Sequence, residues 1–368
     1  MSPLITKTCE TFARLGYEVE LWVPWRYNPQ FKNIDTYEHH HIDRNFVIRK
    51  IPALDLMSFI PGKAGFFILL ATFNVSIFFR VLWHNLKEGV FYTSDARDVI
   101  LLFGFCRIIF IEIHDFYKSS FKFLNKWCFT RARGFVVTNR IKIQILHREY
   151  GIPENKMIHQ PNAVDIAMFG IDVSREEARK ILNIPQDRTI LMYSGHLFGW
   201  KGIHTLAAAA PYLNKDEWIY FVGGAEGDRK EFQKYIEKNK FERIVFFSHQ
   251  DHKKIPFFLR AADVLILPNT AKDPASKYET SPVKLFEYMA SGRPIIASDL
   301  PSIRNIVDEK SVWFFEADSP ASLSKTAHEA LSNTVKAEHK SGAARKEVQR
   351  YSWENRISSV KNFINKNI

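Results

Sequence analysis

The pattern of apolar and polar positions is most regular in the second half of the chain, from about residue 189. Short continuous apolar runs alternate there with segments of helical period. Continuous runs, rather than strictly alternating ones, are typical of strands that are covered on both faces. The pattern therefore predicts a doubly wound parallel α/β domain. Its expected strands are 189–195, 218–224, 243–249, 263–269, 293–299 and 312–317.

The first half shows the same alternation in a less regular form. Because 368 residues exceed what a single hydrophobic core usually serves, we expect two Rossmann-like domains. The first domain is placed over 1–167 and the second over 168–350. An amphipathic helix over 351–368 is expected to pack back on the first domain. The expected strands of the first domain are 18–24, 89–95, 108–114 and 134–139.

The most hydrophobic window of the chain is Ala64–Trp83. Its uncharged run ends at Arg80, short of the ~20 apolar residues that a membrane-spanning helix needs, and Asn74 and Ser76 interrupt it. We therefore expect a buried helix here rather than a membrane span. The N-terminal residues show neither the apolar core nor the cleavage motif of a signal peptide.

The composition, with 46% apolar and 25% charged residues, is that of a globular protein. A net charge of +11 favours anionic partners, namely nucleotides, nucleic acid or an acidic membrane surface. The three cysteines, Cys9, Cys106 and Cys128, are far apart and odd in number, which argues against a disulfide framework and against a cysteine metal site. This usage predicts a reducing, cytoplasmic location.

Two glutamates, Glu279 and Glu287, flank a Ser-Pro pair at the expected start of a helix. Ser281 suits the N-cap position and Gly292 suits the stop. The first turn of such a helix leaves backbone amides without internal partners, and these can bind a phosphate. Glu287, further along, could accept hydrogen bonds from hydroxyl groups. A sugar joined to a nucleoside diphosphate fits this arrangement. The amides concerned are those of Val283, Lys284 and Leu285.

Ligands of open parallel sheets bind beyond the carboxyl ends of the strands. Lys201 is expected there at the start of a helix, where a lysine is electrostatically misplaced unless an anion is bound, although an exposed lysine in a turn fits too. Gly195 and Gly223 would let the backbone approach a ligand, or serve only in turns. His114 ends a strand of the first domain, as a structural hydrogen bonder or as a catalytic group.

A metal site is not expected. The tract His39–His41 consists of consecutive residues that point in different directions, and no carboxylate or cysteine has a spacing that supports it. A DxD pair that would hold a divalent ion on a diphosphate is also missing, as are nucleophile motifs of the Ser-His-Asp and Cys-His types.

Five segments in order carry a resemblance to a known family. The chain resembles the retaining glycosyltransferases of family 4, which have the GT-B fold, two Rossmann-like domains that face a cleft. The resemblance is close from about Gly134 to Arg356. It rests on "HQPNAVDIAMF", "YSGHLFGWKG", "FVGGAEGD", "IPFFLRAADVLILPN" and the E-x7-E spacing of Glu279 and Glu287.

Carried over, the resemblance implies that Lys201 and the helix amides bind the donor diphosphate, and that Glu287 binds the ribose. Glu279 would contact the donor sugar, and His114, in the family's E-x-H pattern with Glu112, would line the sugar site. The implied catalytic residues are Glu279, His114 and Lys201. The implied donor-binding residues are Glu287, Lys201, Gly195, His196, Ser281, Val283, Lys284, Leu285 and Gly223.

Two departures from the family pattern stand out. Many members have Arg where this chain has His196, so a fixed positive charge on the phosphates is missing at that position. The family also begins with a strand and a Gly-rich loop, whereas Met1 leads here almost directly into an expected helix.

A basic segment suggests a membrane partner. Between Phe116 and Arg148 there is no acidic residue, and Lys118, Lys122 and Lys126 fall at i,i+4 spacing beside apolar residues. An interfacial helix has this pattern, as does a solvated basic face over a core. We expect the segment Lys118–Arg148 to attach the protein peripherally to an anionic bilayer that holds a lipid-linked acceptor.

The implied function is retaining transfer of a sugar from a UDP- or GDP-sugar to a hydroxyl of a glycan or lipid-linked acceptor, in cell-surface polysaccharide or glycolipid synthesis. No metal and no organic cofactor are expected. Since no second carboxylate is evident as a nucleophile, attack from the same face is favoured. A non-catalytic partner subunit and a nucleotide-sugar epimerase remain open as alternatives. Nucleic-acid binding would leave the two glutamates and the Rossmann pattern unexplained.

Overall fold

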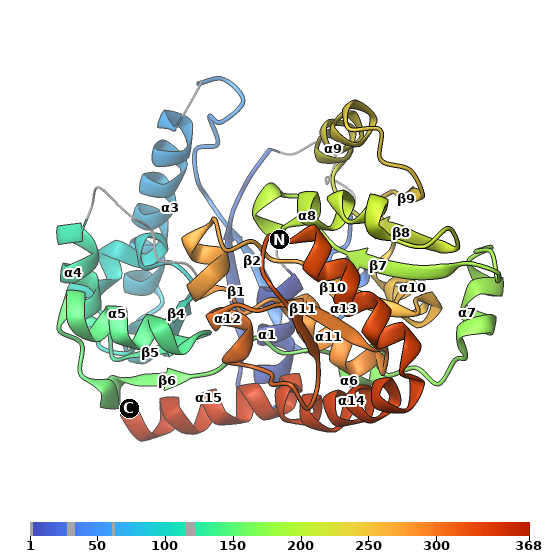
Figure 1. The fold of residues 1–368 in the computed structure, drawn as a ribbon. Helices are drawn as coiled ribbons and strands as arrows, with labels where there is room; N and C mark the ends of the chain where they lie inside the picture. The colour runs from blue at the N-terminus through green and yellow to red at the C-terminus, as the bar shows by residue number, and fades with distance from the viewer. Residues whose placement is uncertain (1–2, 28–33, 61–62, 115–121) are drawn as a thin grey trace. The chain divides into compact units, whose positions relative to one another are not determined.

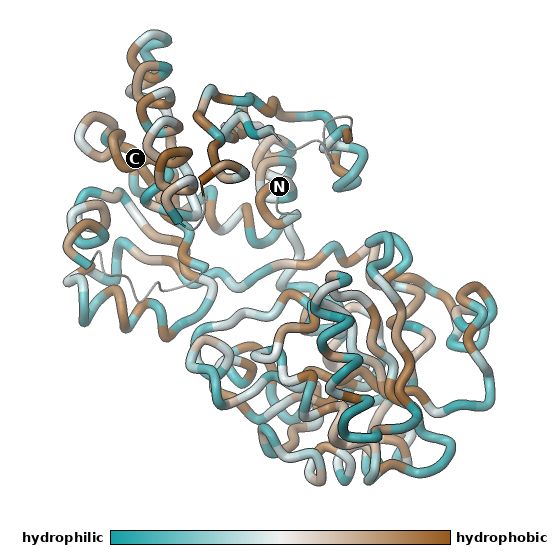
Figure 2. The backbone as a smooth tube through the Cα atoms, turned by 90° about the horizontal axis from the view of Figure 1, so that it is seen from above, coloured by the Kyte–Doolittle hydropathy of each residue, from teal (hydrophilic) through white to brown (hydrophobic). Residues whose placement is uncertain are grey.

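The computed structural model describes residues 3–27, 34–60, 63–114 and 122–368. The chain divides into two compact units (Figure 1). Unit 1 comprises 1–160 together with 353–368, and unit 2 comprises 161–352. The boundary between them thus falls before the expected 167, and the C-terminal helix is counted with unit 1. Apolar and polar stretches alternate along the backbone in both units (Figure 2).

Unit 2 is built on a six-stranded, entirely parallel sheet with the order β12-β11-β10-β7-β8-β9. All six strands expected from the apolar runs are present. The order reverses between β7 and β10, so that the sheet has the Rossmann arrangement and a topological switch point. The strands are β7 (Thr189–Ser194), β8 (Glu217–Val222), β9 (Ile244–Phe247), β10 (Val264–Leu267), β11 (Ile295–Ser298) and β12 (Trp313–Phe315).

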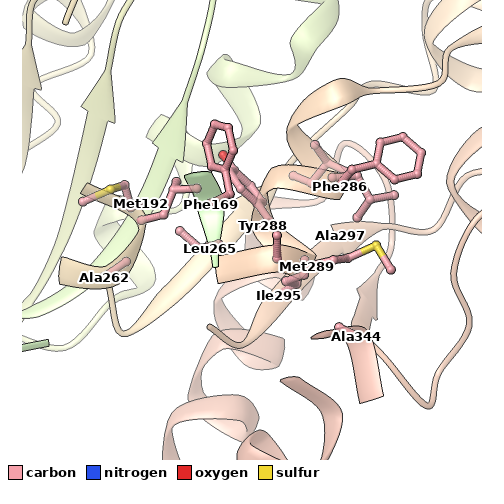
Figure 3. Close-up of a cluster of buried hydrophobic side chains, with 14 of the residues drawn as sticks. Phe169, Met192, Ala262, Leu265, Phe286, Tyr288, Met289, Ile295, Ala297 and Ala344 are labelled. Atoms are coloured by element: carbon pink, nitrogen blue, oxygen red, sulfur yellow. The ribbon is translucent and has the colours of Figure 1, made fainter. Parts of the chain in front are cut away.

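Both faces of this sheet are covered by apolar side chains, which explains the continuous runs. Ile190 and Met192 of β7 point into one core, whereas Leu191 and Tyr193 of the same strand point into the other. Figure 3 shows part of the first core. The helices are α6 (Ile166–Phe169), α7 (Arg175–Ile181), α8 (Ile203–Ala208), α9 (Glu226–Lys238), α10 (Ile255–Ala261), α11 (Val283–Ser291), α12 (Pro301–Arg304), α13 (Pro320–Ser332) and α14 (Thr334–Glu347).

Unit 1 holds a four-stranded parallel sheet, β3-β4-β5-β6, and a separate parallel pair, β1-β2. The four expected strands form. Two further strands were not predicted, because Arg49 and Lys50 interrupt the apolar residues of β2 and β6 has only three residues. The strands are β1 (Glu20–Pro24), β2 (Val47–Ile51), β3 (Phe91–Thr93), β4 (Ile109–Ile113), β5 (Gly134–Val137) and β6 (Met157–His159).

The last helix of the chain packs within unit 1. Tyr17 Oη donates to Asn365 Oδ1 at 2.7 Å, and Lys361 Nζ donates to the Leu15 carbonyl at 2.7 Å. These contacts join the last helix to the end of the first. The helices of unit 1 are α1 (Pro3–Arg14), α2 (Thr36–His40), α3 (Ala64–Trp83), α4 (Lys122–Arg131), α5 (Arg140–Tyr150) and α15 (Trp353–Asn367).

The expectation that Ala64–Trp83 is a buried helix is confirmed only in part. One side of α3 packs into the core of unit 1 through Phe73, Ile77 and Val81. Only 33% of its most apolar 18-residue window is buried, however, and the helix is long and apolar enough to cross a membrane. The apolar window therefore reflects an exposed apolar face as well as a buried one.

The basic side chains of the segment Lys118–Arg148 differ in their exposure and contacts. Lys118 lies outside the described residues. Lys142 is fully buried and donates to the Thr138 hydroxyl at 2.8 Å, so it cannot face a membrane. The Arg133 side chain donates to the last carbonyls of the chain, at Asn367 and Ile368. Lys122 and Lys126 of α4 are exposed.

Candidate active site

The switch point of unit 2 gathers most of the expected donor-binding residues. The loop after β7 contains Gly195, His196 and Lys201, and the segment after β10 leads through a short π-helical turn, Ala275–Glu279, into α11. Both follow the carboxyl ends of neighbouring strands, since β10 pairs directly with β7. This is the place where an open parallel sheet binds its ligand.

The glycines of these loops are needed because backbone packs against backbone. Gly202 has φ +74°, and a Cβ atom there would lie 1.7 Å from the Pro268 carbonyl oxygen. Gly223 has φ +108°, and its Cβ would lie 2.9 Å from the carbonyl oxygen of Gly195. Packing against the neighbouring loop therefore explains why residue 223 is a glycine, and no bound ligand is needed to explain it.

Lys201 ends a 3₁₀ turn, 199–201, directly before α8. Its Nζ lies 3.6 Å from the centroid of the Trp200 ring. Besides burial, which is the larger cause, the charge of Lys201 lowers the pKa of both His196 and Lys284. Lys201 thus belongs to a cluster of basic groups at the switch point.

The side chain of Lys284 also belongs to the site, whereas the sequence pattern indicated a role only for its backbone amide. The side chain is buried, and Nζ donates to Tyr193 Oη at 2.5 Å. Burial, followed by the charge of Lys201, holds the Lys284 pKa well below its ordinary value. A Cβ atom on Gly195 would lie 2.5 Å from this nitrogen. The available signal was the position of Lys284 one turn before the buried Tyr288 on an apolar helix face.

His196 stands beside this lysine. Burial, and then the charges of Lys284 and Lys201, lower the pKa of His196. Its ring stacks on that of Phe198 at a centroid distance of 5.0 Å. Two lysines thus act on His196 and one of them also acts on Lys284, and an anion bound among the three groups would relieve that repulsion.

The start of α11 differs from the expected N-cap. Pro282 occupies the N-cap position, and the Ser281 hydroxyl instead accepts the Asn162 N–H at 3.1 Å. The Asn162 amide group donates in turn to the Ser281 carbonyl at 2.6 Å. The N–H of Leu285 donates to the Pro282 carbonyl at 2.9 Å, so this amide is not offered to a phosphate. Val283 and Lys284 are the first two residues of the helix. The carbonyl that would accept from an amide at such a position lies before the helix begins, so these amides have no acceptor within it.

The two glutamates of the E-x7-E pair occupy different elements. Glu279 is the last residue of the π-helical turn and is half-buried. Glu287 lies on α11, and its Oε1 is 3.7 Å from Nε2 of His252, a residue that the sequence reading did not single out. The nearby Glu287 carboxylate raises the pKa of His252. A histidine thus faces the carboxylate that is expected to bind ribose.

His114 in unit 1 is held by a buried carboxylate. Its Nε2 lies 2.8 Å from Glu112 Oε1, and Arg356 of α15 contacts the same oxygen at 2.6 Å. The Tyr92 hydroxyl donates to the other oxygen of Glu112. Burial alone would raise the Glu112 pKa, but Arg356 and His114 hold it far below its usual range. Glu112 is therefore an anion that orients the His114 ring.

The two units, each built on a parallel sheet, are those of the GT-B class. The structure resembles sucrose-phosphate synthase from Thermosynechococcus elongatus, with 18% identity, a TM-score of 0.80 and coverage of 98% of this chain and 92% of that one. It also resembles Anabaena HepE in complex with UDP-glucose, with 16% identity, a TM-score of 0.75 and coverage of 99% and 95%. The fold is GT-B.

Residues 174–347 match the family model "Glycosyl transferases group 1". Over this segment the chain is similar to the group 1 glycosyltransferases. An uncharacterized glycosyltransferase of Methanocaldococcus jannaschii is 24% identical over 56% of this chain and 53% of the relative. A phosphatidyl-myo-inositol mannosyltransferase of Mycobacterium leprae is 25% identical over 59% and 56%. The chain spans about half the length of the curated relatives it matches.

Proposed function

We propose that this protein is a retaining glycosyltransferase that moves a sugar from a nucleoside-diphosphate sugar to a hydroxyl of a glycan or lipid-linked acceptor. The observation that carries the proposal is the cluster of His196, Lys201 and Lys284 at the switch point of unit 2. Three basic groups that repel one another make a site for a diphosphate. The complex of HepE with UDP-glucose, a relative in fold, supports a nucleotide sugar as donor.

The leaving diphosphate gains negative charge as the bond to the sugar breaks, and fixed positive groups stabilise that charge. We assign this role to Lys201, to the Lys284 side chain and to the amides of Val283 and Lys284. Lys284 then replaces the arginine that many family members have where this chain has His196. Its nitrogen lies against Gly195, the residue before His196, so the charge is supplied from α11 instead of from the loop.

Glu287 is proposed to accept hydrogen bonds from the ribose hydroxyls, with His252 holding the carboxylate in place. The remaining contacts come from the family resemblance: Glu279 to the donor sugar, and His114, oriented by Glu112, to the sugar site. Attack of the acceptor hydroxyl on the face that the diphosphate leaves gives retention. Metal independence is proposed from the missing DxD pair.

The acceptor class is proposed from the family. One relative is named for mannosyl transfer to phosphatidyl-myo-inositol, and cell-surface polysaccharide or glycolipid synthesis is the corresponding role. A cytoplasmic location agrees with the free thiols of Cys9, Cys106 and Cys128.

The test combines binding with product analysis. Thermal stabilisation by UDP-, GDP- and ADP-sugars, with and without EDTA, is measured for the wild type and for Glu287→Ala. We expect one nucleotide to stabilise the wild type in EDTA and to stabilise the variant far less. Incubation with that donor and lipid or glycan acceptors should yield a product of unchanged anomeric configuration. An isomerised free nucleotide sugar would indicate an epimerase. If no nucleotide sugar binds, the protein is a non-catalytic subunit. Either result overturns the proposal.

A further inference from the structure

The helix α3 carries a continuous exposed stripe of apolar side chains. Five of its members are four residues apart, about one helical turn, and therefore lie on one face, with Leu82 beside them. Phe79 is 62% exposed and Trp83 is 87% exposed, which is unusual for such large apolar groups. Beside the stripe, Phe66 is exposed too. The stripe consists of Phe67, Ala71, Val75, Phe79, Leu82 and Trp83.

The opposite side of α3 is anchored in unit 1. Phe73, Ile77 and Val81 are part of its core, and the buried Asn74 side chain donates to the Arg97 carbonyl at 2.9 Å. Turning this helix across a bilayer would expose part of the core and break that hydrogen bond. The stripe is therefore suited to lie along a membrane surface while the helix stays in place.

A basic pocket lies next to the stripe. Its volume is about 320 Å³, and it lies between α3 and strand β2. The charged groups in it are Arg49, Lys50 and Arg80. The carboxylate of Glu20 lies nearby, where it pairs with Arg49 and is 3.5 Å from Arg80. The Arg80 Nε is buried and makes no hydrogen bond to the described residues. The pocket is lined by Ile48, Arg49, Lys50, Ile51, Pro52, Ser76 and Arg80.

Helix α3 contributes residues to both the apolar stripe and the basic pocket. Ser76 and Arg80 line the pocket, and each stands next in sequence to an exposed apolar residue, Val75 and Phe79. The sequence has no acidic residue between Asp55 and Glu88. An amphiphile with an anionic head and an apolar body matches this pairing of surfaces.

We propose that unit 1 docks on an anionic lipid bilayer through α3, with the apolar stripe at the boundary of headgroups and acyl chains and a lipid phosphate in the basic pocket. The proposal moves the membrane contact from the segment Lys118–Arg148 to α3. It does not depend on the glycosyltransferase activity, because docking needs neither donor nor acceptor.

The test is co-sedimentation of the full chain with vesicles at low salt, without nucleotide. Vesicles of phosphatidylcholine with phosphatidylglycerol are compared with vesicles of phosphatidylcholine alone. The variants are Phe79→Ser with Trp83→Ser for the stripe, and Lys50→Glu for the pocket. Matched controls on exposed positions of unit 2 are Val335→Ser and Lys215→Glu. Far-UV circular dichroism and thermal unfolding check that each variant folds.

We expect the wild type to bind anionic vesicles and the double variant to lose at least about tenfold in partition, as removal of two inserted aromatic rings should cause. Lys50→Glu should reduce the preference for anionic vesicles, and both controls should behave as the wild type. Equal partition of the wild type and the folded double variant would overturn the proposal. So would resistance of the bound protein to alkaline carbonate extraction, because that result would mean that α3 spans the bilayer.

Discussion

Arg356 of the last helix lies 2.6 Å from Oε1 of Glu112, the carboxylate that also contacts His114. Both charged side chains are almost completely buried, at 3% and 6% exposure. Residues far apart in the chain thus form one ionic unit, and helix α15 fixes the strand end that carries a candidate catalytic histidine. The C-terminal residues are therefore part of the support of the site in unit 1.

Replacing Arg356 by Met should be strongly destabilising, because it leaves the Glu112 charge buried without its main partner. We expect a loss of about 3 to 5 kcal/mol in the free energy of unfolding. The double variant Arg356→Met with Glu112→Gln should recover part of that loss. Urea unfolding followed by circular dichroism measures both. If the single variant is as stable as the wild type, Arg356 does not stabilise the buried carboxylate.

The ion pair of Glu112 with Arg356 also predicts how the stability of the fold depends on pH. The pKa of Glu112 is lower in the folded chain than in the unfolded chain, so its contribution is present above the ordinary glutamate value of about 4.3 and is lost as pH falls below it. Stability of the wild type should therefore drop more steeply on acidification than that of Glu112→Gln. Unfolding curves from neutral to acidic pH test this difference.

Lys284→Met should affect donor binding and stability in opposite directions. Loss of the Lys284 contact should weaken binding of the donor's nucleoside diphosphate at least about tenfold, whereas removal of a buried amino group should leave the stability of the free protein unchanged or higher. Adding His196→Arg to this variant should restore most of the affinity. Isothermal titration calorimetry and thermal unfolding give the two readouts.

Lys215→Met, on an exposed turn, is the matched control and should leave the affinity for the same nucleoside diphosphate as in the wild type. Unchanged affinity in Lys284→Met would contradict the diphosphate role. A loss of both affinity and stability, without rescue by His196→Arg, would assign Lys284 a structural role only.

His252 should titrate above its ordinary pKa because of Glu287. The raised pKa means that the stabilising interaction is complete below the unfolded value of 6.5 and disappears as pH rises through the folded value. The histidine is partly exposed, so the contribution should stay below about 1 kcal/mol. NMR titration of the His252 ring protons in the wild type and in Glu287→Gln measures the shift. Identical titration curves would show that the two groups do not interact.

Gly202→Ala should unfold the switch point locally. The added Cβ would meet the Pro268 carbonyl oxygen at 1.7 Å in a backbone conformation of φ +74°. We expect at least about 3 kcal/mol of destabilisation and loss of binding of the donor nucleotide. The control is Gly227→Ala in α9, where nothing lies within 4 Å of the new atom. That change should be neutral or stabilising by up to about 1 kcal/mol, and stability of Gly202→Ala equal to this control would contradict the packing argument.

The apolar runs predicted every strand of the six-stranded sheet, since strands that are buried on both faces need continuous apolar residues. Strand β2 could not be found this way, because its exposed residues, such as Arg49 and Lys50, leave no apolar run. The N-cap assignment of Ser281 failed for a related reason. The serine is suitable for capping, but the hydrogen bonds with Asn162 engage it elsewhere.

The sequence by itself determined the class of fold, the order of the motifs and the residue types of the candidate donor site, because those depend on local periodicity and on spacing along the chain. Only the tertiary structure decided what surrounds each side chain. It buried Lys284 against Tyr193, joined Arg356 to Glu112 and left one face of α3 uncovered. Burial and charge pairing arise from residues distant in the chain, and these set the desolvation and Coulomb energies that local patterns do not contain.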